Sequence, residues 1–496
     1  MSETMQQASA QDIQERAAID QSARLPVLFF FTSAAGWLFL ATLLGFASSL
    51  KLAAPELWDA CPWLAYGQLF PAHMDSLIYG WGMQAGFGVM IWLMARLCRV
   101  EVKNGVTLVA AGMVWNLTVL FGVVAVWSGY GNSMPWLDFP AYLWPAMFLS
   151  YAVIAGTLMM MFRRRREGEA YISQKYIFAA ALWFPWIFIT ANLILNHVGG
   201  SAVMNAGVNV WFMSNLIYFW FVPVGLASAY YIIPKIVGRP IYSYQLAQIA
   251  FWALAVLAGW TGFNRFLGGP FPSWMPAISG AAILLMLLPI GAVAVNFLGT
   301  LSGRGRLMHY SPSLRFTVFG GIMFNVYGLL VAFSSYFDVS RLLQFSYATL
   351  GYDIMIIYGF FSMVVFGAIY FIVPRITGCE WPSAKLIRFH FWYSSYGIIT
   401  IVAFMIFAGL AQGGAIDDWS GDFMDSVRRG KGYVVALAVA WALISVANLA
   451  FYYQLLMMAF GFGRKSEGPT LIHKNPGEAA SAEEAAGFAT EETAKA

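Results

Sequence analysis

Long apolar stretches separated by short polar connections make up most of the chain. A helix needs roughly 20 apolar residues to cross the hydrocarbon core of a bilayer. Twelve stretches of that kind lie at 25–50, 72–97, 105–128, 136–162, 174–196, 207–233, 245–268, 276–300, 313–337, 348–374, 386–411 and 432–460. In lipid, each backbone polar group must bond within its own segment, which favours helices. The pattern predicts an all-α polytopic membrane protein, a bundle of twelve transmembrane helices.

The same pattern predicts three parts. Residues 1–24 form a polar N-terminal segment, and residues 25–460 form one membrane domain without an inserted soluble domain. Residues 461–496 form a tail whose last part is rich in Ala, Glu and Thr and lacks an apolar face. A segment of that composition cannot bury enough apolar surface to fold alone, so we expect the tail to be disordered.

Basic residues indicate the orientation of the bundle. They gather in the connections that follow the even-numbered stretches, as in the run of four arginines at 163–166, and are sparse after most odd-numbered ones. Connections rich in Lys and Arg stay in the cytoplasm. We therefore expect both termini to be cytoplasmic.

Composition narrows the class of protein further. The chain is 60% hydrophobic and only 10% charged, against about 25% charged in soluble domains. Most of the chain is therefore expected to be surrounded by membrane lipid. The sequence shows no cluster of basic residues of the kind that binds nucleic acid, so we expect no nucleic-acid partner. The three cysteines include no C-x-x-C-H motif, so no covalently attached haem is expected.

Several sequence motifs resemble a known family. The chain reads Y-Y-I-I-P-K at 230–235, G-R-P-I-Y-S-Y at 238–244, F-G-A-I-Y-F-I-V-P-R at 366–375 and H-F-W at 390–392. These motifs resemble subunit I of the C-type (cbb-type) haem–copper oxidases, and the resemblance extends over about residues 25–460. It implies a respiratory electron-transport protein of the bacterial cytoplasmic membrane. Such a protein works as a terminal oxidase or nitric oxide reductase with other subunits, such as a membrane-anchored cytochrome c.

The resemblance also implies a set of six histidine ligands. In the family, a low-spin haem is ligated by one His on helix two and one His on helix ten. A second haem is ligated by another His on helix ten. Copper, or iron in nitric oxide reductases, is held by one His on helix six and two on helix seven. This chain contains only five His in total.

A position-by-position comparison with the family motifs retains one ligand. His73, shortly after Pro71 on helix two, matches a low-spin haem ligand. Five ligand positions and the position of the family's active-site Tyr carry other residues. In chain order these substituted positions are Ser214, Ala258, Asn264, Arg265, Tyr352 and Ile354. Ile has no donor atom, and Arg is a cation that repels a metal. We therefore expect no dinuclear centre, no copper and no catalytic residues.

Polar residues at the former ligand positions suggest what fills the vacated space. Ionisable groups at membrane depth are costly and usually pair or face a polar cavity. We expect a cluster in the outer part of the bundle, formed by Arg265, Asn264, Ser214, Asp353 and Tyr352. Asn215 and Ala258 are further candidates for residues of the cavity. This cluster either replaces the cofactors as a structural element or forms a site for a small molecule or ion.

Two haem-related hypotheses remain open. His73 either ligates a single b-type haem or forms an ordinary hydrogen bond at a helix start. Arg428 and Arg429, which we place in the last outer loop, either bind haem propionates or form an exposed cluster near several Asp residues.

The sequence therefore predicts a redox-inactive or haem-poor homologue of an oxidase subunit I, a pseudoenzyme that acts as a scaffold. One alternative is an active terminal oxidase or nitric oxide reductase that retains a b-type haem. Another is a repurposed channel, transporter or small-ligand sensor that uses the polar cavity.

Overall fold

The computed structural model describes residues 3–166, 168–418 and 420–463. The predicted disordered tail lies outside the described residues, apart from residues 461–463. His473 belongs to this tail and is not among the described residues.

Twelve helical spans cross the molecule, which confirms the predicted fold class, and the described residues contain no β-strand. The first six spans are α1 (Glu3–Ala53), α2 with η2 and α3 (Tyr66–Asp75, Ser76–Gly82, Met83–Cys98), α4 (Gly105–Trp127), η3 with α5 (Ala141–Leu143, Trp144–Arg163), α6 with η4 (Ile172–Leu193, Ile194–Val198), and α7 with η5 and α8 (Ala202–Leu216, Ile217–Phe221, Val222–Val237). The last six are α9 with η6 and η7 (Tyr244–Leu257, Ala258–Trp260, Phe263–Phe266), α10 with α11 (Trp274–Leu285, Leu287–Leu301), α13 (Pro312–Ser334), α15 with η8 and α16 (Tyr347–Ile354, Met355–Ser362, Met363–Thr377), α17 (Ala384–Asp417) and α18 (Phe423–Ala459). Three short elements lie outside the spans: η1 (Pro62–Leu64), α12 (Leu307–Tyr310) and α14 (Phe337–Leu343).

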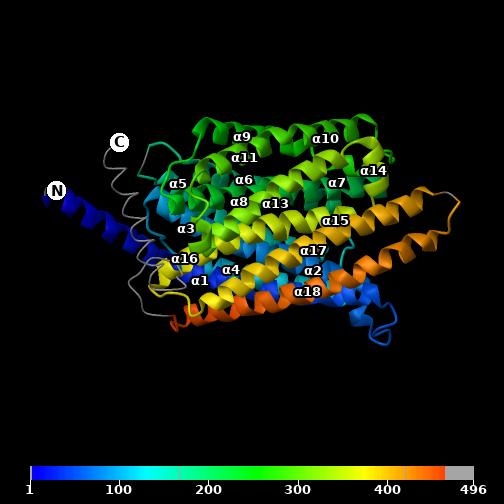
Figure 1. The fold of residues 1–496 in the computed structure, drawn as a ribbon, viewed down its shortest axis with the longest axis horizontal. Coiled ribbons are helices and arrows are strands. Elements are labelled where there is room, and N and C mark those ends of the chain that lie inside the picture. Colours follow the sequence, from blue (N-terminus) through cyan, green and yellow to red (C-terminus); the bar gives the residue numbers. More distant parts are fainter. Residues whose placement is uncertain (1–2, 167, 419, 464–496) are drawn as a thin grey trace.

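The polar N-terminal segment is helical and continues directly into the first span as α1. Figure 1 shows this helix extending from one end of the elongated bundle. Ion pairs hold its polar part against the end of α3: Arg96 contacts Asp20 at 3.4 Å, and Arg99 contacts Asp12 at 2.8 Å and Glu15 at 2.7 Å. Charge pairing therefore holds the polar start of α1 against the end of α3.

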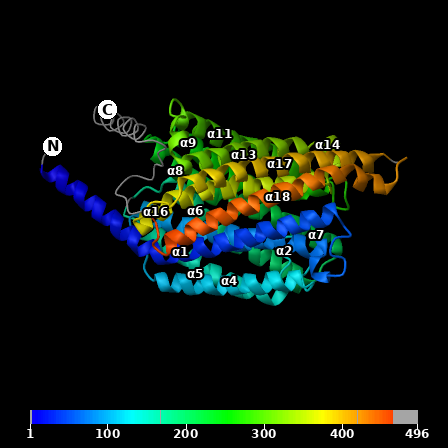
Figure 2. The ribbon, with the colours of Figure 1, turned by 60° about the horizontal axis from the view of Figure 1, so that its bottom comes forward.

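The second, sixth and tenth spans form the centre of the bundle. Between 94% and 100% of their most apolar windows is buried, whereas the other nine spans bury 39% to 56%. Figures 1 and 2 show the remaining helices packed around them along the long axis. Residues on these three central helices consequently lie in the interior, away from lipid.

Two glycines bring α17 into backbone contact with α14 and with the start of the tenth span. A Cβ at Gly409 would lie 2.5 Å from the amide nitrogen of Ala348. A Cβ at Gly413 would collide with the carbonyl of Leu342 in α14. Neither contact leaves room for a side chain, so both positions require glycine. This close approach holds α14 in place.

A methyl group at Gly413 should therefore destabilise the fold. We expect Gly413→Ala to lower the free energy of unfolding by about 1–3 kcal/mol, the usual cost of overpacking. Gly414→Ala is the matched control, because no atom lies within 4 Å of its Cβ position. Thermal unfolding of both variants in detergent measures the difference. Equal melting temperatures would show that α17 and α14 are not in backbone contact.

Candidate functional site

A change in helical winding follows the positions to which the family resemblance assigns metal ligands on all three central helices. His73 and Ser214 each lie three residues before a π-helical segment, η2 and η5 respectively, and Tyr352 and Ile354 lie directly before η8. π-Helical turns are rare and frequently occur at functional sites. The three helices thus share one backbone irregularity at the level where the family resemblance places the metals.

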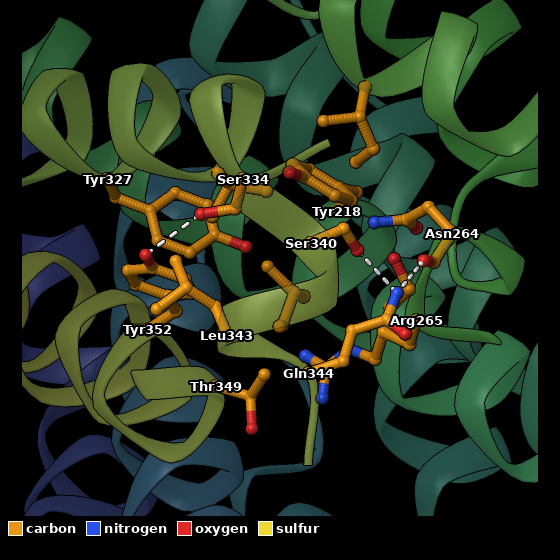
Figure 3. Close-up of a pocket in the computed structure, with 14 residues that line it drawn as sticks. Tyr218, Asn264, Arg265, Tyr327, Ser334, Ser340, Leu343, Gln344, Thr349 and Tyr352 are labelled. Atoms are coloured by element: carbon orange, nitrogen blue, oxygen red, sulfur yellow. Dashed lines mark hydrogen bonds between the residues drawn. The ribbon is translucent and has the colours of Figure 1, made fainter. Parts of the chain in front are cut away.

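A polar cavity of about 60 Å³ lies beside two of these segments. Figure 3 shows its labelled side chains, which come from η5, η7, α13, α14 and α15. The lining residues are Ser214, Ile217, Tyr218, Asn264, Arg265, Ile283, Tyr327, Val331, Ser334, Ser340, Leu343, Gln344, Thr349 and Tyr352. That volume suits a few water molecules and is far below the roughly 300 Å³ of the smallest common ligand pockets.

The charged group of the cavity is an ion pair between Arg265 and Asp353. Nη1 of Arg265 donates to Oδ2 of Asp353 at 3.1 Å, and Nη2 donates to Oδ1. The Asp353 side chain is 2% exposed, whereas 26% of the Arg265 side chain remains accessible. This two-bond geometry is the strong form of an arginine–carboxylate pair. The arginine therefore neutralises a buried carboxylate and also faces the cavity.

The turn before Arg265 sets the direction of that side chain. Gly262 has φ +114°, a backbone conformation that L side chains rarely adopt. A Cβ there would also lie 2.9 Å from the Cα of Trp211 on α7. The glycine thus allows the chain to turn tightly against α7 and to start the short helix η7 that carries Arg265.

Three further hydrogen-bonded pairs surround the ion pair. They are Ser214 with Thr261 (2.7 Å), Ser279 with Asn264 (3.1 Å) and Ser334 with Tyr352 (2.8 Å). Each polar side chain that stands at a former ligand position in this region consequently has a protein partner.

Four of the residues predicted for this region do not line the cavity: Asp353, which is paired with the lining residue Arg265, and Ile354, Ala258 and Asn215. Ile354 is 1% exposed and Ala258 is fully buried, both within the apolar core. Asn215 is also fully buried and donates to the carbonyl of Trp211 at 2.8 Å, while its Oδ1 has no hydrogen-bond partner.

Sequence reasoning missed several lining residues, and helical spacing could have found one of them. Tyr218 lies four residues after Ser214, and residues four apart share one face of a helix. Gln344 follows α14, where no site residue was predicted, and it donates to the backbone carbonyl of Asn264 at 2.9 Å. Tyr327 on α13 gave no such signal, because no predicted site residue lies on that helix.

His73 lies in a separate place, between the first, second and twelfth spans. Its Nδ1 is 2.7 Å from the carbonyl oxygen of Ala41, and its Nε2 is buried without a hydrogen-bond partner. The ring of Trp441 packs edge-on against the imidazole, with centroids 4.8 Å apart, and lies 6.4 Å from the ring of Tyr358 on the tenth span. Trp441 thus contacts rings on both helices that hold the low-spin haem in the resembling family.

Comparison with known proteins adds to these observations. The family model described as "Cytochrome C and Quinol oxidase polypeptide I" matches residues 25–461. The chain belongs to the haem–copper oxidase subunit I family. The family membership predicted from the motifs is thereby confirmed.

Individual members of the family are distant relatives. The chain is 26% identical over 442 residues to the Cbb3-type cytochrome c oxidase subunit CcoN1 of Stutzerimonas stutzeri, covering 85% of this chain and 90% of that protein. It is 23% identical to a cytochrome c oxidase subunit 1 homolog of Agrobacterium tumefaciens, covering 86% and 82% respectively. A cryo-EM structure of a heme-copper terminal oxidase dimer has the same fold, with a TM-score of 0.72, 13% identity and 91% coverage of this chain.

The side chains of this oxidase homologue do not fit the copper and high-spin haem of its family. Ser214, Asn264 and Arg265 stand at positions where the family resemblance implies metal-binding imidazoles, and each is hydrogen-bonded to protein. In the described part of the chain, no three His, Cys, Asp or Glu side chains come together. A low-spin haem fits only in part: His73 offers one nitrogen, but Ile354 offers no donor, and Trp441 packs against the imidazole.

The other described histidines have ordinary environments. His390 is buried against Phe451, and its Nδ1 lies 2.9 Å from the hydroxyl of Tyr370. His197 and His309 are exposed.

The predicted position of Arg428 and Arg429 in an outer loop is wrong. Both lie in α18, which begins at Phe423, nine residues before the predicted start of the twelfth helix. Arg428 pairs with Asp425 at 3.0 Å on the helix surface. Arg429 precedes Trp441 by 12 residues, or about 18 Å along a helix. Helix α18 extends past the apolar stretch because such intrahelical ion pairs stabilise its polar first turns.

A buried carboxyl group outside the spans was also missed. Asp138 lies in the connection between α4 and η3 and is 5% exposed. Its Oδ2 accepts a hydrogen bond from the backbone amide of Trp136 at 3.2 Å. Burial raises the pKa of Asp138 to about 7. The carboxylate of Asp75, which interacts with Asp138, is fully buried, and neither of its oxygens has a hydrogen-bond partner.

Removing one member of the Arg265–Asp353 pair should cost more than removing both. We expect Arg265→Leu to lower the free energy of unfolding by about 3–5 kcal/mol, because it leaves a carboxylate buried without a partner. The double variant Arg265→Leu/Asp353→Leu should recover most of that loss. Arg341→Leu is the control, since its pair with Asp417 is exposed and worth less than about 1 kcal/mol. Additive losses in a double-mutant cycle would contradict a coupled pair.

The raised pKa of Asp138 predicts a stability that falls with pH. Its ordinary pKa is near 3.8, so between about pH 4 and pH 7 the folded state holds a proton that the unfolded state has lost. The free energy of unfolding should therefore decrease across that interval, by about 1.4 kcal/mol per unit of pKa difference. Asp138→Asn should flatten the dependence, and Asp338→Asn, which removes an exposed carboxylate, should not. Thermal unfolding at several pH values tests this, and an unchanged slope in Asp138→Asn would refute it.

Proposed function

We propose that this chain is a redox-inactive member of the haem–copper oxidase subunit I family and acts as a membrane scaffold within a respiratory complex. The observation that carries the proposal is the Arg265–Asp353 pair. Arg265 stands at a position where the family resemblance implies a copper-ligating imidazole, and its two hydrogen bonds fix a positive charge there. A metal cation at the same place would be repelled by the guanidinium.

The surroundings of the ion pair support the same conclusion. The hydroxyl of Ser214 is engaged by Thr261, and the cavity of about 60 Å³ leaves room for a few waters only. Catalysis at this place would need an open coordination position and a path for a substrate. The buried pair instead joins η7 to α15 and so holds the seventh and tenth spans together.

The setting of this scaffold follows from its family and its charge pattern. We place it in the bacterial cytoplasmic membrane with both termini in the cytoplasm, because the basic connections lie on the side of the N-terminus. Its partners are other subunits of the complex, such as a membrane-anchored cytochrome c. Support comes from the relatives, which are named as subunits of bacterial cytochrome c oxidases.

A second candidate is a subunit that retains one b-type haem on His73. The observation in its favour is the buried Nε2 without a partner, combined with an Nδ1 that hydrogen-bonds a backbone carbonyl. Metal-ligating histidines usually show this arrangement, in which the second nitrogen fixes the ring orientation. The missing ligand at Ile354 and the contact with Trp441 favour the haem-free scaffold.

Haem content distinguishes the two candidates. We expect the purified protein to give no stoichiometric b-type signal in a pyridine haemochrome assay or in a reduced-minus-oxidised spectrum. The Stutzerimonas stutzeri relative, produced and purified in parallel, controls for haem supply. A signal near one haem per chain that disappears in His73→Ala would establish the second candidate. Stoichiometric haem together with copper would overturn the scaffold proposal altogether.

A further inference from the structure

A groove of about 760 Å³ opens on the outer surface of the bundle between α13 and α17, which contact each other and appear as neighbours in Figure 2. It is at the end of the bundle that carries the N-terminus, because an even number of spans precedes it. Basic residues from α12, α13 and α17 surround one end of the groove, and apolar side chains of α13 and α17 form the wall that continues toward the middle of the bundle.

Four basic side chains gather at the end of the groove: Arg306, His309, Arg315 and Arg388. No ion pair found among the described residues includes any of them. Arg315 donates from Nε to the carbonyl of Met308 at 3.0 Å and from Nη2 to the carbonyl of His309 at 2.8 Å. Its guanidinium carbon also lies 5.4 Å from the centre of the Phe391 ring. These contacts fix the side chain of Arg315 at the end of the groove. No carboxylate pairs with any of the four basic side chains in the described part of the chain.

The wall of the groove is apolar and accessible. Trp392, Tyr396 and Ile399 are 46%, 61% and 46% exposed, and their spacing places them on one face of α17. Ser395 also lines the groove, and its hydroxyl is buried without a hydrogen-bond partner. Seven residues separate it from Arg388, which is about 10 Å along the helix. This hydroxyl lies beneath the apolar wall, so the accessible part of the wall is aromatic and aliphatic.

We propose that this groove binds an anionic glycerophospholipid from the leaflet on the side of the N-terminus. The arginines receive the phosphate, since guanidinium groups match phosphate oxygens in a two-bond geometry. The acyl chain lies along the aromatic and aliphatic wall of α17. Basic pockets between transmembrane helices on this side of a membrane commonly hold anionic lipid headgroups.

The shape of the groove favours a lipid over a soluble anion. Inorganic phosphate could neutralise the arginines but would leave the apolar wall uncovered. A zwitterionic lipid would cover the wall but would bring a positive group toward the arginines. An anionic phospholipid would neutralise the arginines with its headgroup and cover the apolar wall with its acyl chain.

Competition between lipids tests the proposal on the full-length protein. The protein is reconstituted with an equimolar mixture of phosphatidylglycerol and phosphatidylcholine, extracted mildly, and its retained lipids are measured by native mass spectrometry. We expect preferential retention of phosphatidylglycerol. The variant Arg306→Gln/Arg315→Gln/Arg388→Gln should reduce that preference at least about tenfold, which corresponds to about 1.4 kcal/mol.

Two further variants separate the groove from general surface charge. Lys103→Gln/Arg163→Gln/Arg164→Gln removes three exposed charges at the same end of the bundle, outside the groove, and should leave the preference unchanged. Ile399→Trp keeps all charges but fills the wall, and should weaken retention. Size-exclusion chromatography and thermal unfolding confirm that each variant is folded.

Three results would overturn the proposal. Equal retention of the two lipids by the natural chain would remove the basis for headgroup recognition. An equal loss in both triple variants would show that bulk charge, not the groove, attracts the lipid. Full displacement of phosphatidylglycerol by millimolar inorganic phosphate, with no effect of Ile399→Trp, would identify a free phosphate as the ligand.

Discussion

A carboxylate in the interior of a membrane protein needs a positive partner, and this requirement organises the centre of the molecule. Asp353 lies almost fully buried on the tenth span and meets Arg265 from the turn after α9. The pairing requires the sharp turn at Gly262, which in turn requires close approach to α7. The polar cavity, the position of η7 and the contact between the seventh and tenth spans all depend on it. The remaining polar side chains of the cavity form short-range pairs around this charge.

The fold could be predicted closely from the sequence, because a helix that crosses lipid needs about 20 apolar residues and bonds its own backbone groups. Each apolar stretch of sufficient length became one span, and all twelve were located. The ends were less predictable where helices continue past the bilayer, since there ion pairs replace apolar burial. The first turns of α18 illustrate this: Asp425 and Arg428 pair on a helix that looks like a charged loop in the sequence. The N-terminal part of α1 is a second example.

The site was only partly predictable, for reasons that differ between residues. Arg265 and Asp353 were noticeable because ionisable groups are rare at membrane depth. Tyr218 and Tyr327 were not, because tyrosine is common in this chain and acquires a role only when two helices face each other. The π-helical segments have no sequence signature that a search for apolar periodicity detects. The partner of each polar group, such as Thr261 for Ser214, depends on packing between distant parts of the chain.

The tryptophan beside His73 has an evolutionary consequence. Reintroducing a histidine at Ile354 would supply the second axial ligand in one step, yet the ring of Trp441 would still occupy the space next to the imidazole. Replacing Trp441 first would leave a void in the core, at a typical cost of about 3–5 kcal/mol. Either order of change passes through an unfavourable intermediate. For the haem-free scaffold proposed above, this large side chain is therefore an obstacle to a stepwise gain of haem binding, whatever selective advantage the cofactor would bring.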